Sequence, residues 1–522
     1  MRISTAQFYE SSAANYQKNF ANAVKSSEEA SSLVRINTAA DDPVGASRLL
    51  QLDQQASMID QYTANTTAIK TTLGTTESVM TSIGNVLQRA RELAIGAGNG
   101  AYTDADRQAT ASELGQIEEQ LLSLMNTKDE SGKYIFAGSK GDTVPFSRNS
   151  DGTYSYNGDQ TTLNLPIGDT MSMAANSTGW EAFQQAINAS RSQTALTSPA
   201  VNDGRVLLSD GLVSASATYN NRFRSGEPYT VDFLSGTQLK ITDASGNDVT
   251  AEASKNGAFS SKDATTQSIS FRGVDLRLNI NLQAGDTDPD AVISGHSFSL
   301  TSKPDSFNVS RSPGNPSTAQ VTGSTVSNAA DYNGSFPTGG AILKFTSATG
   351  YELYASPVTA DSKPVSTGSL VGSTATAAGV DFNLSGAPQA GDQYVIAVNN
   401  HQTQNILDTV SQLRSALLAP ISTDPALAQR FTAELSAGIA NLTSGTEQLS
   451  SALSSVGGRG AALDTQTEAN ASIALANKQT QSAIRDSDPA AVMTRLTLQQ
   501  TMLQASQLAF SKIAQLGLFN KV

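Results

Sequence analysis

The chain has few side chains that could carry out chemistry, and its two histidines come first among them. His296 lies in a strand-like run, and His401 lies where the composition changes from strand-like to helical. Neither has a second histidine four residues away, and the chain contains no cysteine, so a zinc pair and a thiol nucleophile are both excluded. No serine, histidine and aspartate stand in a triad order. We expect both histidines to be structural.

Two short segments resemble ligand-binding loops. Asp286–Asp290 begins like a calcium loop, but Ala291 stands where the turn glycine belongs and Ser297 where the bidentate glutamate belongs. Gly457–Gly460 is rich in glycine, but no strand precedes it and no Lys-Ser/Thr pair follows, as a phosphate loop requires. We interpret the first as a solvated turn and the second as a local loosening of a coiled coil. The sequence therefore predicts no catalytic residue, no metal and no cofactor.

Composition narrows the range of partners. The 522 residues carry a net charge of −13 without a cluster of lysine or arginine, which argues against binding to nucleic acid or to an anionic membrane. No stretch reaches the length of a membrane span, and the first residues lack the apolar core of a signal peptide. We therefore expect a chain that is neither inserted in a membrane nor exported through a cleaved signal peptide.

Long helices are the elements around which this chain is built. Apolar and small residues recur at steps of three and four from Leu52 to Ala94, which predicts a rod helix of roughly 45 residues. Asp42 and Pro43 provide its cap and first position, while Asp41 adds negative charge near its start. Glycines from Gly96 onward end it, and a second helix near residues 104–127 folds back.

The C-terminal part of the chain shows the same pattern of helix start and apolar seam. Asp424 and Pro425 open a helix with the same cap and proline, and a largely heptad seam follows from Leu435 to Ile473. We expect this seam to pair with the seam from Leu52 to Ala94 within one chain. The predicted fold class is α+β and multidomain, with long terminal coiled-coil or helical-bundle rods and inserted all-β domains.

The middle of the chain, residues 143–400, changes to short alternating runs bounded by turn residues, apart from a short helix expected at Gly179–Ile187. It also contains a repeat: residues 273–286 align without gaps on residues 379–392, with eight identities in fourteen. The repeat predicts two β domains. The expected segments are an axial helix 1–40, a rod part 41–142, a hairpin region 143–203, β domains 204–302 and 303–400, a rod part 401–485 and an axial helix 486–522.

The two ends differ from the rods. Residues 1–35 form a sparse helical pattern, whereas the stretch from Pro489 to Val522 carries apolar residues on more than one face of a helix. Because the first is a poor partner for the second, we expect burial between copies of the chain. The residues assigned to this contact are Ile3, Phe8, Phe20, Val492, Leu496, Leu503, Phe510, Ile513, Leu516 and Phe519.

Several motifs in these regions together resemble the bacterial flagellin superfamily. They run in order along the chain: Met1-Arg-Ile-Ser-Thr5, Arg35-Ile-Asn37 with Asp41-Asp-Pro43, Leu87-Gln-Arg-Ala-Arg-Glu-Leu93, Gly98-Asn-Gly100 with Asp106-Arg107, Ser131-Gly-Lys-Tyr-Ile-Phe-Ala-Gly138, and Leu516-Gly-Leu-Phe519. The first and last motifs favour the hook-filament junction proteins within that superfamily. The sequence departs from the family pattern at Thr38-Ala-Ala40 and at Gly517.

The resemblance implies a secreted, axial protein of the flagellum that is exported by the flagellar type III route. It implies a homo-oligomeric ring as the assembly, with a neighbouring hook-associated protein and flagellin as partners. It also implies a cytoplasmic export chaperone on the C-terminal helix.

Three other functions stay open at this stage. The chain could be a flagellin, which would polymerise alone into long filaments. It could carry an enzyme on the flagellum, although a His-Glu-x-x-His motif is missing. The β repeats could also form an adhesin or glycan-binding module.

Overall fold

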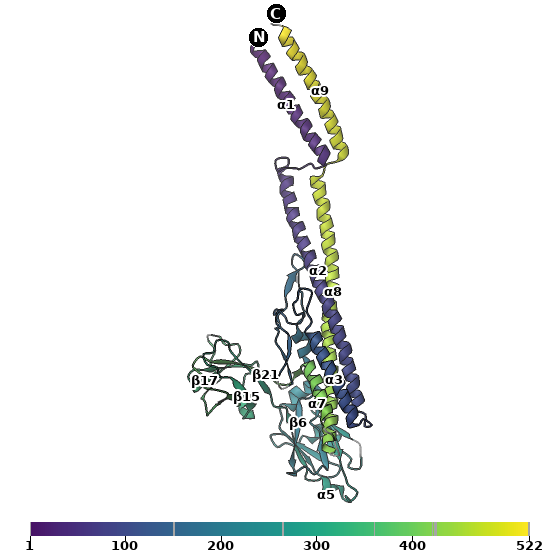
Figure 1. The fold of residues 1–522 in the computed structure, drawn as a ribbon, viewed down its shortest axis with the longest axis vertical. Helices are drawn as coiled ribbons and strands as arrows, with labels where there is room; N and C mark the ends of the chain where they lie inside the picture. The colour runs from purple at the N-terminus through teal and green to yellow at the C-terminus, as the bar shows by residue number, and fades with distance from the viewer. Residues whose placement is uncertain are drawn as a thin grey trace. The chain divides into compact units, whose positions relative to one another are not determined.

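A computed structural model describes residues 2–149, 152–263, 266–359, 361–419, 421 and 425–519. It divides into two compact units, one of residues 1–74, 163–175 and 457–522, and one of residues 75–162 and 176–456. Two long helices, α2 (Pro43–Ala97) and α8 (Pro425–Arg485), each contribute to both units. Long terminal helices with antiparallel sheets between them confirm the predicted fold class (Figure 1).

The first unit contains α1 (Arg2–Ser32), α9 (Pro489–Phe519), the start of α2, the end of α8 and one hairpin. Here α2 and α8 run antiparallel, since Asn477 Nδ2 donates to Leu52 O at 2.9 Å and Lys70 pairs with Asp464. The hairpin of β3 (Asn164–Pro166) and β4 (Ser172–Ala174) also contacts α8, where Asn470 Nδ2 donates to Ile167 O at 2.9 Å. The expected pairing of the two rod seams is therefore confirmed.

The α2 helix begins at Pro43, and Asp42 Oδ1 accepts the Gly45 N–H at 2.9 Å, as a capping carboxylate does. Asp424 lies outside the described residues, and α8 begins at Pro425. The seam side chains of α2 lie within the core. Buried at this seam are Leu52, Ile59, Thr66, Ile69, Leu73, Thr76, Met80, Ile83, Leu87, Ala90 and Ala94.

Two details of the α8 prediction are wrong. The helix runs without interruption through Gly457–Gly460, so the glycines do not loosen its backbone. Ile473, assigned to the seam, is 45% exposed, while Asn470 and Asn477 are buried in its place. These asparagines continue the seven-residue steps of Leu449, Val456 and Leu463, and their amides bond to backbone carbonyls, which removes the cost of burying them.

In the second unit, α3 (Asp104–Met125) and α7 (Ile406–Leu418) accompany the remaining parts of α2 and α8. Thr103 and Asp106 form a reciprocal capping box at the start of α3. The buried Glu118 of α3 accepts a hydrogen bond from Tyr154 OH at 2.6 Å and lies 2.8 Å from Arg414 Nε on α7. Tyr154 belongs to a hairpin, so Glu118 joins three elements.

Short strands and one helical turn lead into the β domains. The turn at Trp180–Gln184 is π-helical and is followed by β5, so the last two residues of the short helix expected at Gly179–Ile187 form a strand instead. The cause is pairing: Ile187 of β5 is the register partner of Thr403 in β22. The bounds here are β1 Phe146–Arg148, β2 Tyr154–Tyr156, η1 Trp180–Gln184, β5 Ala186–Ile187 and β22 Thr403–Gln404.

The first β domain has two sheets, ordered β10-β9-β13-β6 and β11-β12-β7, with β8 also paired to β12. Buried residues from both sheets form a single core. Its elements are β6 Ser192–Ser198, β7 Val206–Leu208, β8 Leu212–Val213, α4 Ser216–Thr218, η2 Tyr219–Phe223, β9 Tyr229–Phe233, β10 Leu239–Thr242, η3 Thr250–Glu252, η4 Ser254–Gly257, β11 Gln267–Phe271, β12 Val274–Ile280, α5 Pro289–Ile293 and β13 Ser297–Ser302.

The second β domain follows the same plan, with sheets ordered β18-β17-β16-β21-β14 and β19-β20-β15 around its own core. The strands β12 and β20, which start the two aligned segments, are both central in their sheets, between β11 and β7 and between β19 and β15. Its elements are β14 Ser306–Arg311, β15 Val321–Val326, α6 Ala329–Ser335, β16 Ala341–Phe345, β17 Gly350–Ala355, β18 Ser366–Ser369, β19 Thr374–Ala377, β20 Val380–Leu384 and β21 Gln393–Asn399.

Candidate functional site

The terminal helices α1 and α9 contact each other along their length and run antiparallel (Figure 1). Asn19 Nδ2 of α1 donates to Ser506 Oγ of α9 at 2.6 Å, and Tyr16 stacks on Phe510 with ring centroids 6.5 Å apart. The sparse pattern of residues 1–35 is thus helical beside a partner, although the segment has little apolar surface of its own.

Only one face of α9 is covered by this pairing. Val492 is 2% exposed, and Leu496 and Leu503 are half-buried, so these residues lie toward the inside of the chain. Exposed apolar side chains occupy the rest of the helix: Met493 (56%), Leu498 (60%), Met502 (50%) and Leu508 (65%). We call these four residues the outer face of α9.

The predicted contact residues divide accordingly. Val492, Leu496 and Leu503 lie toward the inside of the chain, and their assignment to a contact between subunits stays a prediction. Phe20 and Phe510 are 52% and 39% exposed and stay available. The side chains of Ile3, Phe8, Ile513, Leu516 and Phe519 lie outside the described part of the chain. Sequence periodicity indicates apolar residues on more than one face of this helix, and only the position of α1 distinguishes a covered face from a free one.

A compact joint lies where α1 ends and α9 begins. Val34 and Asp486 form an antiparallel bridge, with Ser487 N donating to Leu33 O at 2.9 Å and Arg35 N to Arg485 O at 2.6 Å. Beside it, Glu29 accepts a hydrogen bond from Ser487 Oγ at 2.5 Å and pairs with Arg495.

Two carboxylates of this region are held in their charged form. Burial opposes the charge of Glu29, but its hydrogen bonds with Ser487 and Arg495 outweigh burial and lower its pKa. Asp41 accepts a hydrogen bond from Lys25 Nζ at 2.7 Å and others from Thr38, which lower its pKa to about 2. Asp41 therefore serves this loop, not the start of α2 as the sequence suggested.

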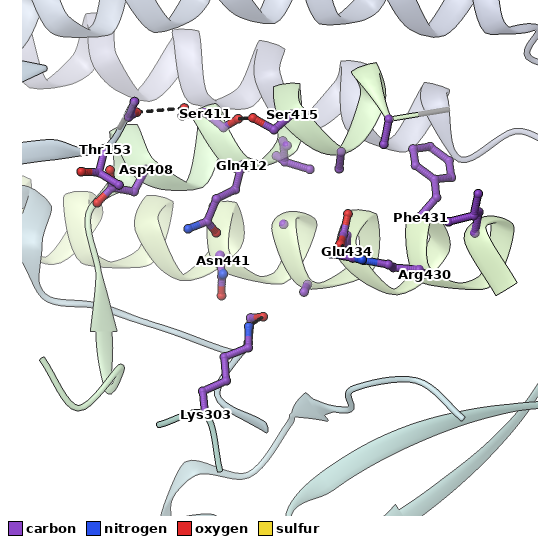
Figure 2. A pocket seen from close by; sticks show the side chains of 18 of the residues that line it. Thr153, Lys303, Asp408, Ser411, Gln412, Ser415, Arg430, Phe431, Glu434 and Asn441 are labelled. Atoms are coloured by element: carbon purple, nitrogen blue, oxygen red, sulfur yellow. Dashed lines mark hydrogen bonds and ion pairs between the residues drawn. The ribbon is translucent and has the colours of Figure 1, made fainter. Parts of the chain in front are cut away.

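A cavity of about 590 Å³ opens between α7, α8 and the segment that enters the second β domain (Figure 2). Its charged groups are held by the chain itself: Lys303 Nζ donates to Ser190 Oγ at 2.7 Å, Arg430 pairs with Glu434 at 2.8 Å, and Asp408 accepts the Tyr154 N–H. Burial lowers the pKa of Lys303. These contacts join elements to one another and assemble no set of groups for acid–base or nucleophilic chemistry.

The other candidate residues also bond within the chain. His296 lies 3.0 Å from Ile293 O and 3.1 Å from Asp203, and His401 lies 2.9 Å from Pro304 O, where burial lowers its pKa. The aspartates of the calcium-like loop do not converge. Asp286 pairs with Arg205, Asp288 caps α5, and Asp290 accepts the Gly236 N–H. Across the described ranges, no helix is long and apolar enough to cross a membrane.

Comparison with known proteins finds similarity to flagellar proteins. Residues 3–141 match the bacterial flagellin N-terminal helical region. The chain is 32% identical over 183 residues to flagellar hook-associated protein 3 of Salmonella typhimurium, covering 35% of this chain and 57% of that protein, with the same values for the Escherichia coli protein. It therefore spans less than two thirds of these relatives. It is also 36% identical over 103 residues to the flagellar filament 41 kDa core protein of Borreliella burgdorferi, which is 20% of this chain and 31% of that protein.

The fold has a solved counterpart. The crystal structure of flagellar hook-associated protein 3 from Legionella pneumophila superimposes with a TM-score of 0.53 over 83% of this chain and 98% of that chain, at 20% sequence identity. At this identity the likeness concerns the fold. The resemblance to the bacterial flagellin superfamily is thus confirmed: residues 3–141 match the flagellin N-terminal helical region, in a chain similar in sequence and in fold to flagellar hook-associated protein 3.

Proposed function

We propose that this chain is a structural axial protein of the bacterial flagellum, a junction adaptor that joins a hook-associated ring to the filament through its terminal helices. The observation that carries the proposal is the outer face of α9, where four large apolar side chains are at least half exposed. No other described part of the chain covers these four side chains, and exposed apolar surface of this kind marks an interaction site. The sequence relatives support a flagellar role.

The partners proposed for this role are further copies of the chain in a ring, a neighbouring hook-associated protein on one side and flagellin on the other. Before assembly, a cytoplasmic export chaperone would cover the C-terminal helix, and the chain would leave the cell by the flagellar type III route without a cleaved signal peptide. The proposed role is mechanical and includes no enzymatic step. The seven segments expected from the sequence remain our proposal for the domain limits.

The test uses the outer face directly. In cells that lack this protein, we would express a variant with Leu498→Gln and Leu508→Gln and image the hook-filament junction. The matched control is Gln500→Ala, which is exposed on the same helix. We expect soluble variant protein, filaments missing from the hook and free flagellin in the medium, while the control restores filaments.

Normal filaments with the double variant would overturn the proposal. Polymerisation of the purified chain alone into long filaments would instead identify a flagellin. Deletion of residues 490–522 provides the stronger version of the same test, with the same expected loss of attachment.

A further inference from the structure

The seam between α1 and α9 does not define a unique register. Small polar residues repeat at seven-residue steps in buried and half-buried positions of α1, at Ser12, Asn19 and Ser26, and two half-buried leucines of α9, Leu496 and Leu503, are seven residues apart. A shift of seven residues would therefore bring one small polar side chain of α1 to the place of the next and Leu496 to the place of Leu503. In coiled coils, such a repeat needs an additional polar or charged contact to fix the register.

Beyond the Tyr16–Phe510 stack, the interior of the seam supplies little of that specificity. Asn19 and Ser506 form one hydrogen bond, but Gln499 Oε1 is buried without a hydrogen-bond partner. Gln499 stands one heptad before Ser506, so an amide is available for Asn19 in the shifted register as well. The hydrogen bond of Asn19 is thus a weak discriminator between the two alignments.

The joint, in contrast, is available in one register only. The Glu29 side chain is 13% exposed and contacts both Ser487 and Arg495 beside the Val34–Asp486 bridge. A seven-residue shift moves one helix by about 10 Å along the other, which separates Glu29 from Arg495 entirely. A partly exposed ion pair adds little to overall stability, but together with the Val34–Asp486 bridge it favours the observed alignment over the shifted one.

We propose that Glu29 is a positioning residue: its contacts with Arg495 and Ser487 act beside the Val34–Asp486 backbone bridge to set the register of the α1–α9 pair. The consequence concerns the outer face, because the register decides which apolar residues of α9 are left uncovered by α1. The importance of this for assembly rests on the function proposed above, whereas the register itself is a property of the isolated chain.

The test exploits the absence of cysteine, which lets introduced pairs report distances without background. Two reporters would be built in the full chain: Asn19→Cys with Ser506→Cys for the observed register, and Asn19→Cys with Gln499→Cys for the shifted one. Disulfide yield after mild oxidation is measured in each. Both reporters lose the Asn19 hydrogen bond, so differences between backgrounds come from the joint.

In the native background we expect the first reporter to oxidise and the second to stay largely reduced. Glu29→Ala should lower the ratio of the two yields by about threefold, the change that an exposed ion pair supports. Glu28→Ala, an exposed neighbour on the same helix, is the matched control and should leave the ratio unchanged. Restoration by the reversed pair, Glu29→Arg with Arg495→Glu, would exclude simple unfolding of α1.

An unchanged ratio in Glu29→Ala would overturn the proposal, as would failure of the reversed pair to restore it. Both readouts use purified chain. They are therefore independent of whether the protein acts at the hook-filament junction.

Discussion

Single residues at the joint combine two kinds of contact that respond differently to solution conditions. The Val34–Asp486 bridge is made of backbone groups and does not titrate, whereas Glu29 and Asp41 act through ionised carboxylates. Acid should therefore weaken the side-chain contacts first. This separates the contribution of the carboxylates from that of the backbone.

For Asp41, the direction of the pH effect follows from its lowered pKa. A carboxylate whose pKa is lower in the folded chain than the usual value of about 3.9 stabilises the fold above that value, and the benefit is lost as the pH falls. The loss should run from about pH 4 down to about pH 2, where Asp41 itself is half protonated. Spin labels on α1 and α2, read by pulsed electron resonance, would report the loosening.

Asp41→Asn should loosen the loop already at neutral pH and flatten this acid response. Asp53→Asn, at an exposed position on α2, is the control and should behave like the native chain. An acid response identical in Asp41→Asn and in the native chain would contradict the role given to this residue.

Residue-level prediction from the sequence succeeded where a pattern had one interpretation. The spacing from Leu52 to Ala94 fits only a helix seam, and every large apolar residue of it between Ile69 and Leu87 is buried. It failed at Asn470 and Asn477, because a buried asparagine is recognisable only when its backbone partner is known. It also could not identify the covered face of α9, which depends on α1 and not on α9 itself.

The two β domains show, at the scale of elements, how a repeat in sequence becomes a repeat in structure. Gly273 and Gly379 occupy equivalent turns with φ of +85° and +78°. A Cβ on Gly273 would lie 2.6 Å from Ala215 O, and one on Gly379 would lie 2.4 Å from Asn328 O. Both carbonyls already accept a backbone N–H, from Tyr219 and Tyr332. The aligned segments thus keep the same close approach of backbone to backbone.

We expect Gly273→Ala and Gly379→Ala each to destabilise its own β domain by more than about 1 kcal/mol, since a left-handed backbone and a steric clash add together. Gly246→Ala is the control: its φ is +84°, but a Cβ there meets nothing within 4 Å. The Gly246→Ala substitution should therefore lower the free energy of unfolding by less than the other two do. Urea unfolding of the purified chains measures the difference, and equal effects at all three positions would show that the clash is unimportant.

Element prediction was sound for the repeat and for the long helices, whose signals extend over many residues. It was weaker for short elements. Residues from Gly179 to Ile187 have a helical composition, but their last two residues pair with the strand β22, which comes from a distant part of the chain. No local pattern encodes such a pairing, which is why the expected helix is shorter in the structure.

For the whole molecule, the chain enters and leaves the second β domain at neighbouring points. Ser306 and Asn399 are register partners in β14 and β21, so their Cα atoms are about 5 Å apart. Replacement of residues 306–399 by two glycines should therefore leave the remaining domains folded. The helical signal in circular dichroism and the attachment of filaments in cells should both be retained.

Removal of Tyr229–Thr242 provides the contrast, because it takes β9 from the interior of its sheet and should unfold the first β domain. Loss of the helical signal when residues 306–399 are replaced would contradict this view. It would show that the second β domain supports the helices.

The pairing of Ile187 with Thr403 determines how much the insertion or loss of a domain between these two residues affects folding. All of residues 188–402 form, in effect, one loop closed by this contact. The entropy of closing a loop grows only with the logarithm of its length, and doubling the length costs about 0.6 kcal/mol. Gain or loss of a domain such as residues 306–399 at this position therefore alters the folding free energy of the rods, through loop closure, by less than a single buried methyl group does.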